Sequence, residues 1–198
     1  MAYPVVEAPY GLKPVNLIGG QVFAGSTRLL PIASGYATSI FNGDVVKLVA
    51  AGTVEKDVGT AAATPVGVFL GCEYTDPNTK QLTFSQYFPA GIVADDIKAY
   101  VCDDPDVVFK VVAVSGTDVV AGYAQSVVGS NVALVQNAGN AVSGNSKVAI
   151  DGTSAATTAT LPIRIIAGVP ETVDASGNFT EFLVKWNAGH QYQTATGV

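Results

Sequence analysis

Few residues in this chain could do acid–base, metal or nucleophilic chemistry. His190 is the only histidine, and it lies in the terminal stretch GHQYQTATGV, which is a poor place to hold a rigid catalytic base. Cys72 and Cys102 are the only cysteines, and they lie 30 positions apart rather than at the short spacing of a zinc site. We therefore predict that the chain is not an enzyme and has no catalytic residue, no cofactor and no metal centre.

Acidic residues gather in short stretches that look like loops. CDDPD brings Asp103, Asp104 and Asp106 together, and TDPN adds Asp76 and Asn78. Oxygen-rich loops of this kind can hold a weakly bound cation. Asp–Pro steps also begin turns, however, and a solvated aspartate is expected at the end of a strand. We favour the turn interpretation.

Two alternatives from other functional classes stay open. A β-barrel hydrolase would need two facing carboxylates, and the candidates are Asp95, Asp96, Asp103, Asp104 and Asp106. A carbohydrate-binding β module would need exposed aromatic side chains on one face, and the candidates are Tyr74, Tyr87, Phe88, Tyr100 and Trp186. The sequence does not bring either set together.

One stretch copies the spacing of a phosphate-binding loop. GNAVSGNS, residues 139–146, follows the pattern G-x-x-x-x-G-K-[ST], except that Asn145 stands where the pattern needs lysine. That lysine supplies the charge that holds the outer phosphates, and no strand-to-helix pattern flanks the stretch. We interpret it as a turn.

The composition excludes some classes of partner. The chain is 48% hydrophobic and only 13% charged, with a net charge of −6, so we predict no nucleic-acid binding. A surface so poor in charge suits a protein whose faces are covered by neighbours.

We also expect no membrane span, because no run reaches the roughly 18 uncharged apolar residues required. The start lacks the basic region of a secretory signal, and we predict that both cysteines are buried free thiols.

The pattern along the chain is typical of β structure. Turn residues recur every eight to twelve positions or so, and the runs between them favour Val, Ile, Thr, Phe and Tyr. In TEFLVKW, Phe182, Val184 and Trp186 should share a buried face. The only passable helix is a short one within 117–128. We predict an all-β fold, a barrel or sandwich of many short antiparallel strands.

Several strings occur twice. GYATSIFNGD (35–44) returns as GYAQSVVGSN (122–131), and PVGVFLG (65–71) returns as PIRIIAG (162–168), after which LTF (82–84) is echoed by FTE (179–181). We infer a weak internal duplication of two β-rich halves, 21–110 and 111–198.

The first twenty residues differ from the rest of the chain. Prolines withhold backbone donors and favour extended structure, yet the segment is too apolar for a solvated tail. We therefore expect an extended N-terminal arm, 1–20, that attaches to another chain, and a β-rich body, 21–198. The residues expected to make the contact are Tyr3, Val5, Val6, Tyr10, Leu12 and Val15.

The C-terminal run LPIRIIAGVPETVDASGNFTEFLVKWNAGHQYQTATGV (161–198) contains PIRIIAG, then an acidic stretch, FTEFLVK and a terminal GHQ. In this it resembles the end of a family of tailed-bacteriophage virion structural proteins. That family has a P-[IF]-R-[IV]-[IV]-G strand, an acidic turn, a [FV]-T-[DE]-x-[LI]-V-[KR] strand and an [NG]-H-Q tail. PYGLKPVNLIGG (9–20) and AYVCDDPDVVFKV (99–111) are also similar to it. The positions that carry the likeness in the C-terminal run are Pro162, Arg164, Gly168, Thr180, Val184, Lys185, His190, Gln191 and Gly197.

The resemblance implies a structural role on the virion. A decoration or cement protein, which binds the outer capsid surface and reinforces contacts between capsomers, is the first interpretation, and a tail or neck component is the alternative. The expected partner is the major capsid protein, with the chain made in the bacterial cytoplasm and then located on the capsid. A homotrimer would suit local threefold axes of a shell.

Overall fold

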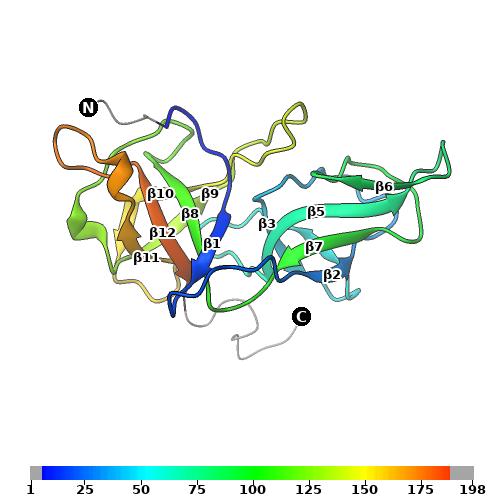
Figure 1. Cartoon of the computed structure of the whole chain (residues 1–198), viewed down its shortest axis with the longest axis horizontal. Coiled ribbons are helices and arrows are strands. Elements are labelled where there is room, and N and C mark those ends of the chain that lie inside the picture. Colours follow the sequence, from blue (N-terminus) through cyan, green and yellow to red (C-terminus); the bar gives the residue numbers. More distant parts are fainter. Residues whose placement is uncertain (1–5, 188–198) are drawn as a thin grey trace.

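A computed structural model describes residues 6–187, and these residues are almost entirely β structure. Strands make up 42% of the chain and helices 3%, which confirms the predicted all-β class. The strands form two six-stranded sheets that lie next to each other along the long axis of the molecule (Figure 1).

One sheet closes into a five-stranded barrel with one added strand, and we call it the barrel. Its closed ring follows the order β8, β12, β11, β9, β10, and a parallel pairing between β10 and β8 completes it. β1 pairs antiparallel with β8 and extends the sheet. The strands are β1 (Lys13–Leu17), β8 (Val107–Val114), β9 (Asn131–Val135), β10 (Ala149–Ala156), β11 (Ile163–Gly168) and β12 (Glu181–Trp186).

The other sheet does not close, and we call it the open sheet. Its order is β2, β7, β5, β3, β4, and β6 pairs with the outer part of β5. The strands are β2 (Arg28–Pro31), β3 (Val45–Leu48), β4 (Val54–Lys56), β5 (Gly67–Thr75), β6 (Leu82–Ser85) and β7 (Lys98–Cys102).

The two sheets share one topology. Without β1 and β6, each sheet has five strands. If these strands are numbered by their order along the chain, their order across the sheet is first, fifth, fourth, second, third, and all neighbours in this order are antiparallel. The barrel differs only in the extra pairing of its first strand with its third. This shared order agrees with the predicted duplication. β6 has no counterpart in the barrel.

The repeated strings fall mostly on equivalent places. The hydroxyl of Tyr36 accepts a hydrogen bond from the backbone N–H of Lys56 at the end of β4, at 3.1 Å. Tyr123 lies against β10, the counterpart of β4, so closely that a Cβ on Gly152 would be 2.2 Å from its ring. The second pair of strings falls on β5 and β11. The third pair does not correspond, because LTF forms β6 while FTE leads into β12.

The expected boundary between the halves is displaced. A division between residues 110 and 111 would cut β8, which runs from Val107 to Val114 and belongs wholly to the barrel. The chain passes from the open sheet to the barrel between Cys102 and Val107.

The larger hydrophobic core fills the barrel and reaches into the open sheet. Phe109, Phe182, Val184 and Trp186 belong to it, which confirms the predicted buried face of the last strand. Val45, Val68 and Cys102 of the open sheet pack into the same core, so the two sheets are joined by apolar contact. A second core within the open sheet includes Phe69, Phe88, Cys72 and Tyr74.

In the part of the chain that the structure describes, helical structure is limited to two single turns, η1 (Gln125–Val127) and η2 (Pro170–Thr172). The helix expected within 117–128 shrinks to η1, because Tyr123 is held extended by reciprocal backbone hydrogen bonds with Phe179 at 2.9 and 2.8 Å. Within 6–187 neither helix is long enough to cross a membrane.

The expectation of a separate N-terminal arm is wrong for residues 12–17. Leu12 is completely buried in the barrel core, and the following five residues form β1 on the edge of β8. Pro14, the one proline among these residues, is compatible with this position because an edge strand needs fewer backbone donors than a central one.

The other expected arm contacts divide into two groups. Val6 and Tyr10 pack against the outer side of β8 and β10, so they find their burial within the chain. Val15 is 41% exposed and remains open to a partner. Tyr3 and Val5 lie outside the described residues.

Candidate functional site

The acidic stretch CDDPD forms a turn in which each carboxylate has its own partner. Asp103 is paired with Arg28. Asp104 accepts the backbone N–H of Asp106 at 2.8 Å, and Asp106 accepts a hydrogen bond from Lys185 at 3.1 Å. The three carboxylates are therefore held apart by separate interactions rather than directed at a common point.

The other acidic candidates also organise loops. Backbone N–H groups of Thr79 and Asn78 donate to the carboxylate of Asp76, at 3.0 and 2.7 Å, and they lower its pKa. Asp96 accepts the hydroxyl of Thr75 at 2.6 Å. Asp95 is exposed. Across residues 6–187, no three or more His, Cys, Asp and Glu side chains gather as a metal site would require.

The aromatic candidates for a sugar-binding face are dispersed. Tyr74, Phe88 and Trp186 are 5%, 0% and 6% exposed, so they belong to the interior. Tyr87 stacks on Phe41 at 5.3 Å between ring centroids. Three of the five side chains thus cannot contribute to an exposed platform. His190 lies outside the described residues.

The stretch that copies a phosphate-binding loop is a hairpin that packs on the open sheet. The backbone N–H of Asn140 donates to Asn145 at 2.9 Å, and that of Asn42 donates to Gly144 at 3.0 Å. Gly139 lies against the ring of Phe41, at a distance that leaves no room for a side chain. No helix follows the hairpin, which agrees with its interpretation as a turn.

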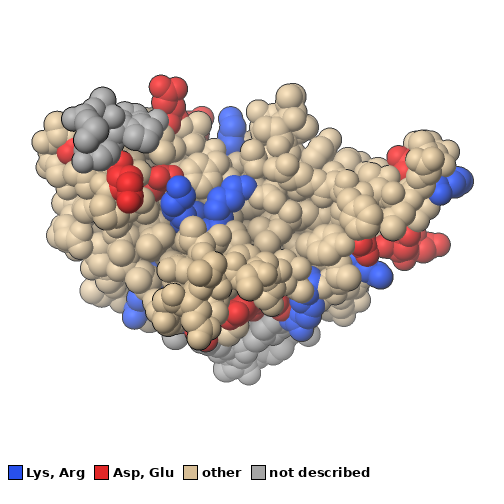
Figure 2. Space-filling model, in the orientation of Figure 1, with Lys and Arg blue, Asp and Glu red and all other residues tan. Residues whose placement is uncertain are grey.

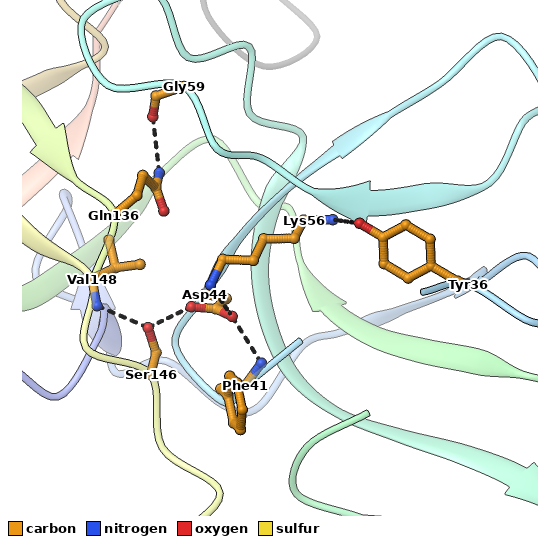
Figure 3. A network of polar contacts seen from close by, with 8 residues as sticks. All are labelled: Tyr36, Phe41, Asp44, Lys56, Gly59, Gln136, Ser146 and Val148. Carbon is orange, nitrogen blue, oxygen red and sulfur yellow. Dashed lines mark hydrogen bonds and ion pairs between the residues drawn. The ribbon is translucent and has the colours of Figure 1, made fainter. Parts of the chain in front are cut away.

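A buried polar network joins this hairpin to the open sheet (Figure 3). Asp44 is completely buried, and its carboxylate lies 3.0 Å from the ammonium group of Lys56. The hydroxyl of Ser146, just before β10, donates to the same carboxylate at 2.6 Å. The N–H of Phe41 donates to it at 2.8 Å, and Ser146 in turn accepts the N–H of Val148 at 2.9 Å.

The Asp44 network has a structural role. Both carboxylate oxygens of Asp44 are occupied, and Ser146 is 1% exposed, so no external substrate can reach the hydroxyl. Beside the network, the amide of Gln136 donates to the carbonyl of Gly59 at 2.9 Å and adds a second link between the two sheets. The network thus fixes the barrel against the open sheet.

A lysine and two asparagines extend the same junction. The ammonium group of Lys13 donates to Asn42 at 2.5 Å and to Asn145 at 3.3 Å. Burial lowers the pKa of Lys13. The residue at the start of β1 therefore contributes to the contact between the sheets as well as to the barrel edge.

The N-terminal segment is fixed by a second polar cluster. The hydroxyl of Tyr10 donates to Glu181 of β12, which is 4% exposed, and burial raises the pKa of this tyrosine. Lys110 of β8 lies 3.4 Å from the same carboxylate and over the Tyr10 ring. This cluster explains why Glu181 is buried although it alternates with the core residues of β12.

A further candidate for function is a set of exposed apolar side chains. Within residues 6–187, ten large ones are spread over both sheets and their loops: Val15, Ile18, Val22, Leu29, Val58, Leu82, Phe84, Val93, Val119 and Val142. Uncharged residues cover most of the face seen in Figure 2, and the charged side chains form small separate groups. These exposed apolar side chains and the uncharged surface around them form a candidate interaction surface.

Sequence reasoning missed two features. The buried network was not predicted, although Asp44 and Ser146 end the two quoted strings GYATSIFNGD and GNAVSGNS. The exposure of Leu82 and Phe84 on β6 was also missed, although their alternation with Thr83 and Ser85 is visible in the sequence.

Comparison with known proteins gives no relative. No protein-family model, no curated protein and no solved structure matches the chain.

Proposed function

We propose that this chain is a structural protein of a tailed-phage virion, which decorates the outer capsid surface and reinforces contacts between capsomers. Its partner is then the major capsid protein, and it has no catalytic role. The observation that carries the proposal is the set of ten large apolar side chains that are exposed among residues 6–187. In addition, charged residues make up only 13% of the chain.

A shell protein needs this kind of surface. Each exposed side chain can gain about 1.5–3 kcal/mol when a partner covers it fully. Val142, Val22 and Phe84 are 98%, 80% and 66% exposed, so most of that gain is still available in the isolated chain. Contacts of this size are weak one by one, but they add up when one body touches several subunits of a lattice.

The β architecture also favours this function. The two sheets are fixed to each other by a shared core and by the Asp44 network, so the exposed side chains are held at constant separations. A rigid body loses little conformational entropy when it binds, which favours attachment through dispersed contacts.

Binding to shells tests the proposal. The purified chain is mixed with shells of the phage that encodes it, prepared from a mutant that lacks the gene, and bound protein is measured by co-sedimentation. We expect saturable binding and a higher temperature of genome release. Immunogold labelling of intact virions gives the location, and a label confined to the tail or neck would contradict the capsid role and support the alternative.

Two triple variants test the observation that carries the proposal. One replaces exposed residues of the barrel by serine (Val22, Val119 and Val142), and the other does so on the open sheet (Leu29, Val58 and Val93). Each set is the matched control of the other for folding and solubility. We expect at least one set to lose shell binding with an unchanged melting temperature. Full binding by both would contradict a role for these side chains.

A further inference from the structure

β6 presents one unpaired edge. The N–H of Asp76 donates to Gln81 at 2.9 Å, so these residues form a hydrogen-bonded pair of the antiparallel β5–β6 ladder. Hydrogen-bonded and non-hydrogen-bonded pairs alternate along an antiparallel ladder. The next residues of β6 whose backbone groups bond to β5 are therefore Thr83 and Ser85. The backbone groups of Leu82 and Phe84 therefore point outward, where none of the described residues pairs with them.

The outer edge of β6 lacks the usual protection of edge strands. Natural sheets block such edges with proline, charge or a covering segment. β2, at another margin of the open sheet, carries Pro31 and an Arg28 paired with Asp103. Residues 80–86 (KQLTFSQ) contain no proline and only one charge, Lys80.

The side chains of this edge are apolar. Leu82 and Phe84 are 57% and 66% exposed, and their spacing puts them on the same face of β6. Figure 1 shows β6 at the margin of the open sheet, beside β5. β6 is also the strand of the open sheet that the shared five-strand topology does not need.

The edge is complementary to itself. Around Thr83 the sequence reads almost the same in both directions, with Leu82 matching Phe84 and Gln81 matching Ser85. An antiparallel pair of such strands places apolar on apolar and polar on polar. No residue of β6 itself is charged, and Lys80 lies in the preceding turn with φ +58°, so no like charges meet along the pair.

We propose that β6 pairs antiparallel with β6 of a second copy of this chain, across a twofold axis at Thr83. Leu82 of each copy exchanges backbone N–H···O=C bonds with Phe84 of the other, and their side chains cover one another. Twofold pairing consumes both edges, so it gives a closed dimer instead of an open fibre. The inference goes beyond the proposed function and does not depend on shell binding.

The oligomeric state tests this interface. The chain has a mass of 20.2 kDa, and light scattering after gel filtration at tens of micromolar should give twice that mass. The double variant Leu82→Lys/Phe84→Lys should halve it, because lysine opposes edge pairing. Val93→Lys/Val142→Lys, which changes two residues elsewhere that are at least as exposed as Leu82 and Phe84, should remain dimeric.

Disulfide trapping tests the register. Thr83 of the two copies would face each other in a non-hydrogen-bonded pair, with Cα atoms about 4.5 Å apart, which suits a disulfide. Ser85 of one copy would lie roughly 14 Å from Ser85 of the other. Thr83→Cys should therefore form a covalent dimer on mild oxidation, while Ser85→Cys should not. The native cysteines are both buried and should not interfere.

The outcomes separate the alternatives. A single-chain mass at every concentration, or a dimer that survives the double lysine variant, would overturn the proposal. Equal trapping through Thr83→Cys and Ser85→Cys would indicate random collision or another strand at this edge. A mass of three chains would support the homotrimer expected from the sequence and exclude the twofold pair.

Discussion

The carboxylate of Asp44 lies 3.0 Å from the ammonium group of Lys56, and the side chain of Asp44 is completely buried. Asp44 precedes β3 of the open sheet, whereas its other partner, Ser146, precedes β10 of the barrel. One buried carboxylate thus connects the ends of two strands within a sheet and also connects the two sheets.

Replacing Asp44 should be strongly destabilising. Asp44→Asn leaves the 10%-exposed ammonium group of Lys56 without its counter-charge, and breaking a buried pair in this way costs about 3–5 kcal/mol. Asp95→Asn, the same change at an exposed carboxylate, should alter the free energy of unfolding by less than about 0.5 kcal/mol. Urea denaturation followed by circular dichroism measures both. Equal stabilities would mean that the Asp44 pair does not hold the sheets.

Trp186 should stabilise the barrel through packing. It is 6% exposed, its ring centroid lies 5.6 Å from that of Phe109, and its indole N–H has no acceptor among the described residues. Trp186→Ala should therefore lose burial and leave a cavity, at about 3–5 kcal/mol. Val142→Ala, which truncates an apolar side chain that is 98% exposed, is the control and should cost far less. A melting temperature unchanged by Trp186→Ala would put this side chain outside the core.

The N-terminal segment should contribute to folding, contrary to the expectation of an extended arm that attaches to another chain. Leu12→Ala removes a fully buried side chain and should cost about 2–5 kcal/mol, whereas Val15→Ala, three residues later on the exposed side of β1, should have little effect. Deleting residues 1–17 should then abolish the cooperative thermal transition, since it removes both Leu12 and β1. A truncated chain that still melts cooperatively would restore the arm interpretation.

The two cysteines should be unreactive in the folded chain. Burial raises the pKa of both Cys72 and Cys102 from 9.0 to about 12, so hardly any thiolate forms near neutral pH. At pH 8 a thiol reagent should modify Val142→Cys rapidly and the native thiols only after unfolding. Rapid modification of the unaltered chain would contradict their burial.

The raised pKa values of the two thiols also predict how the free energy of unfolding depends on pH. Between about pH 9 and 12 the unfolded chain has released these thiol protons while the folded chain retains them, so the folded state binds more protons. The free energy of unfolding should consequently fall as pH rises through that window. The variant Cys72→Ala/Cys102→Ala should show a smaller fall over the same range. If the free energy of unfolding falls equally with pH in the variant and in the unaltered chain, the thiols are excluded as the cause of the fall.

The sequence by itself determined the features that depend on neighbours along the chain. Alternation in TEFLVKW placed Phe182, Val184 and Trp186 on one buried face, because successive side chains of a strand point to opposite sides. Frequent turn residues between β-forming runs predicted the all-β class. The repeated GYA strings pointed to two halves, and the shared strand order agrees with them.

Only the tertiary structure decided which strands became partners. The proline-rich start suits an attachment arm or an edge strand equally well, and its place was settled by the free edge of β8, some ninety residues away along the chain. In the same way, Asp44 met Ser146 and the barrel closed through β8 and β10 because distant segments offered matching groups. Local patterns set the shape and polarity of a segment, whereas pairing depends on which edges and charges the rest of the fold leaves unsatisfied.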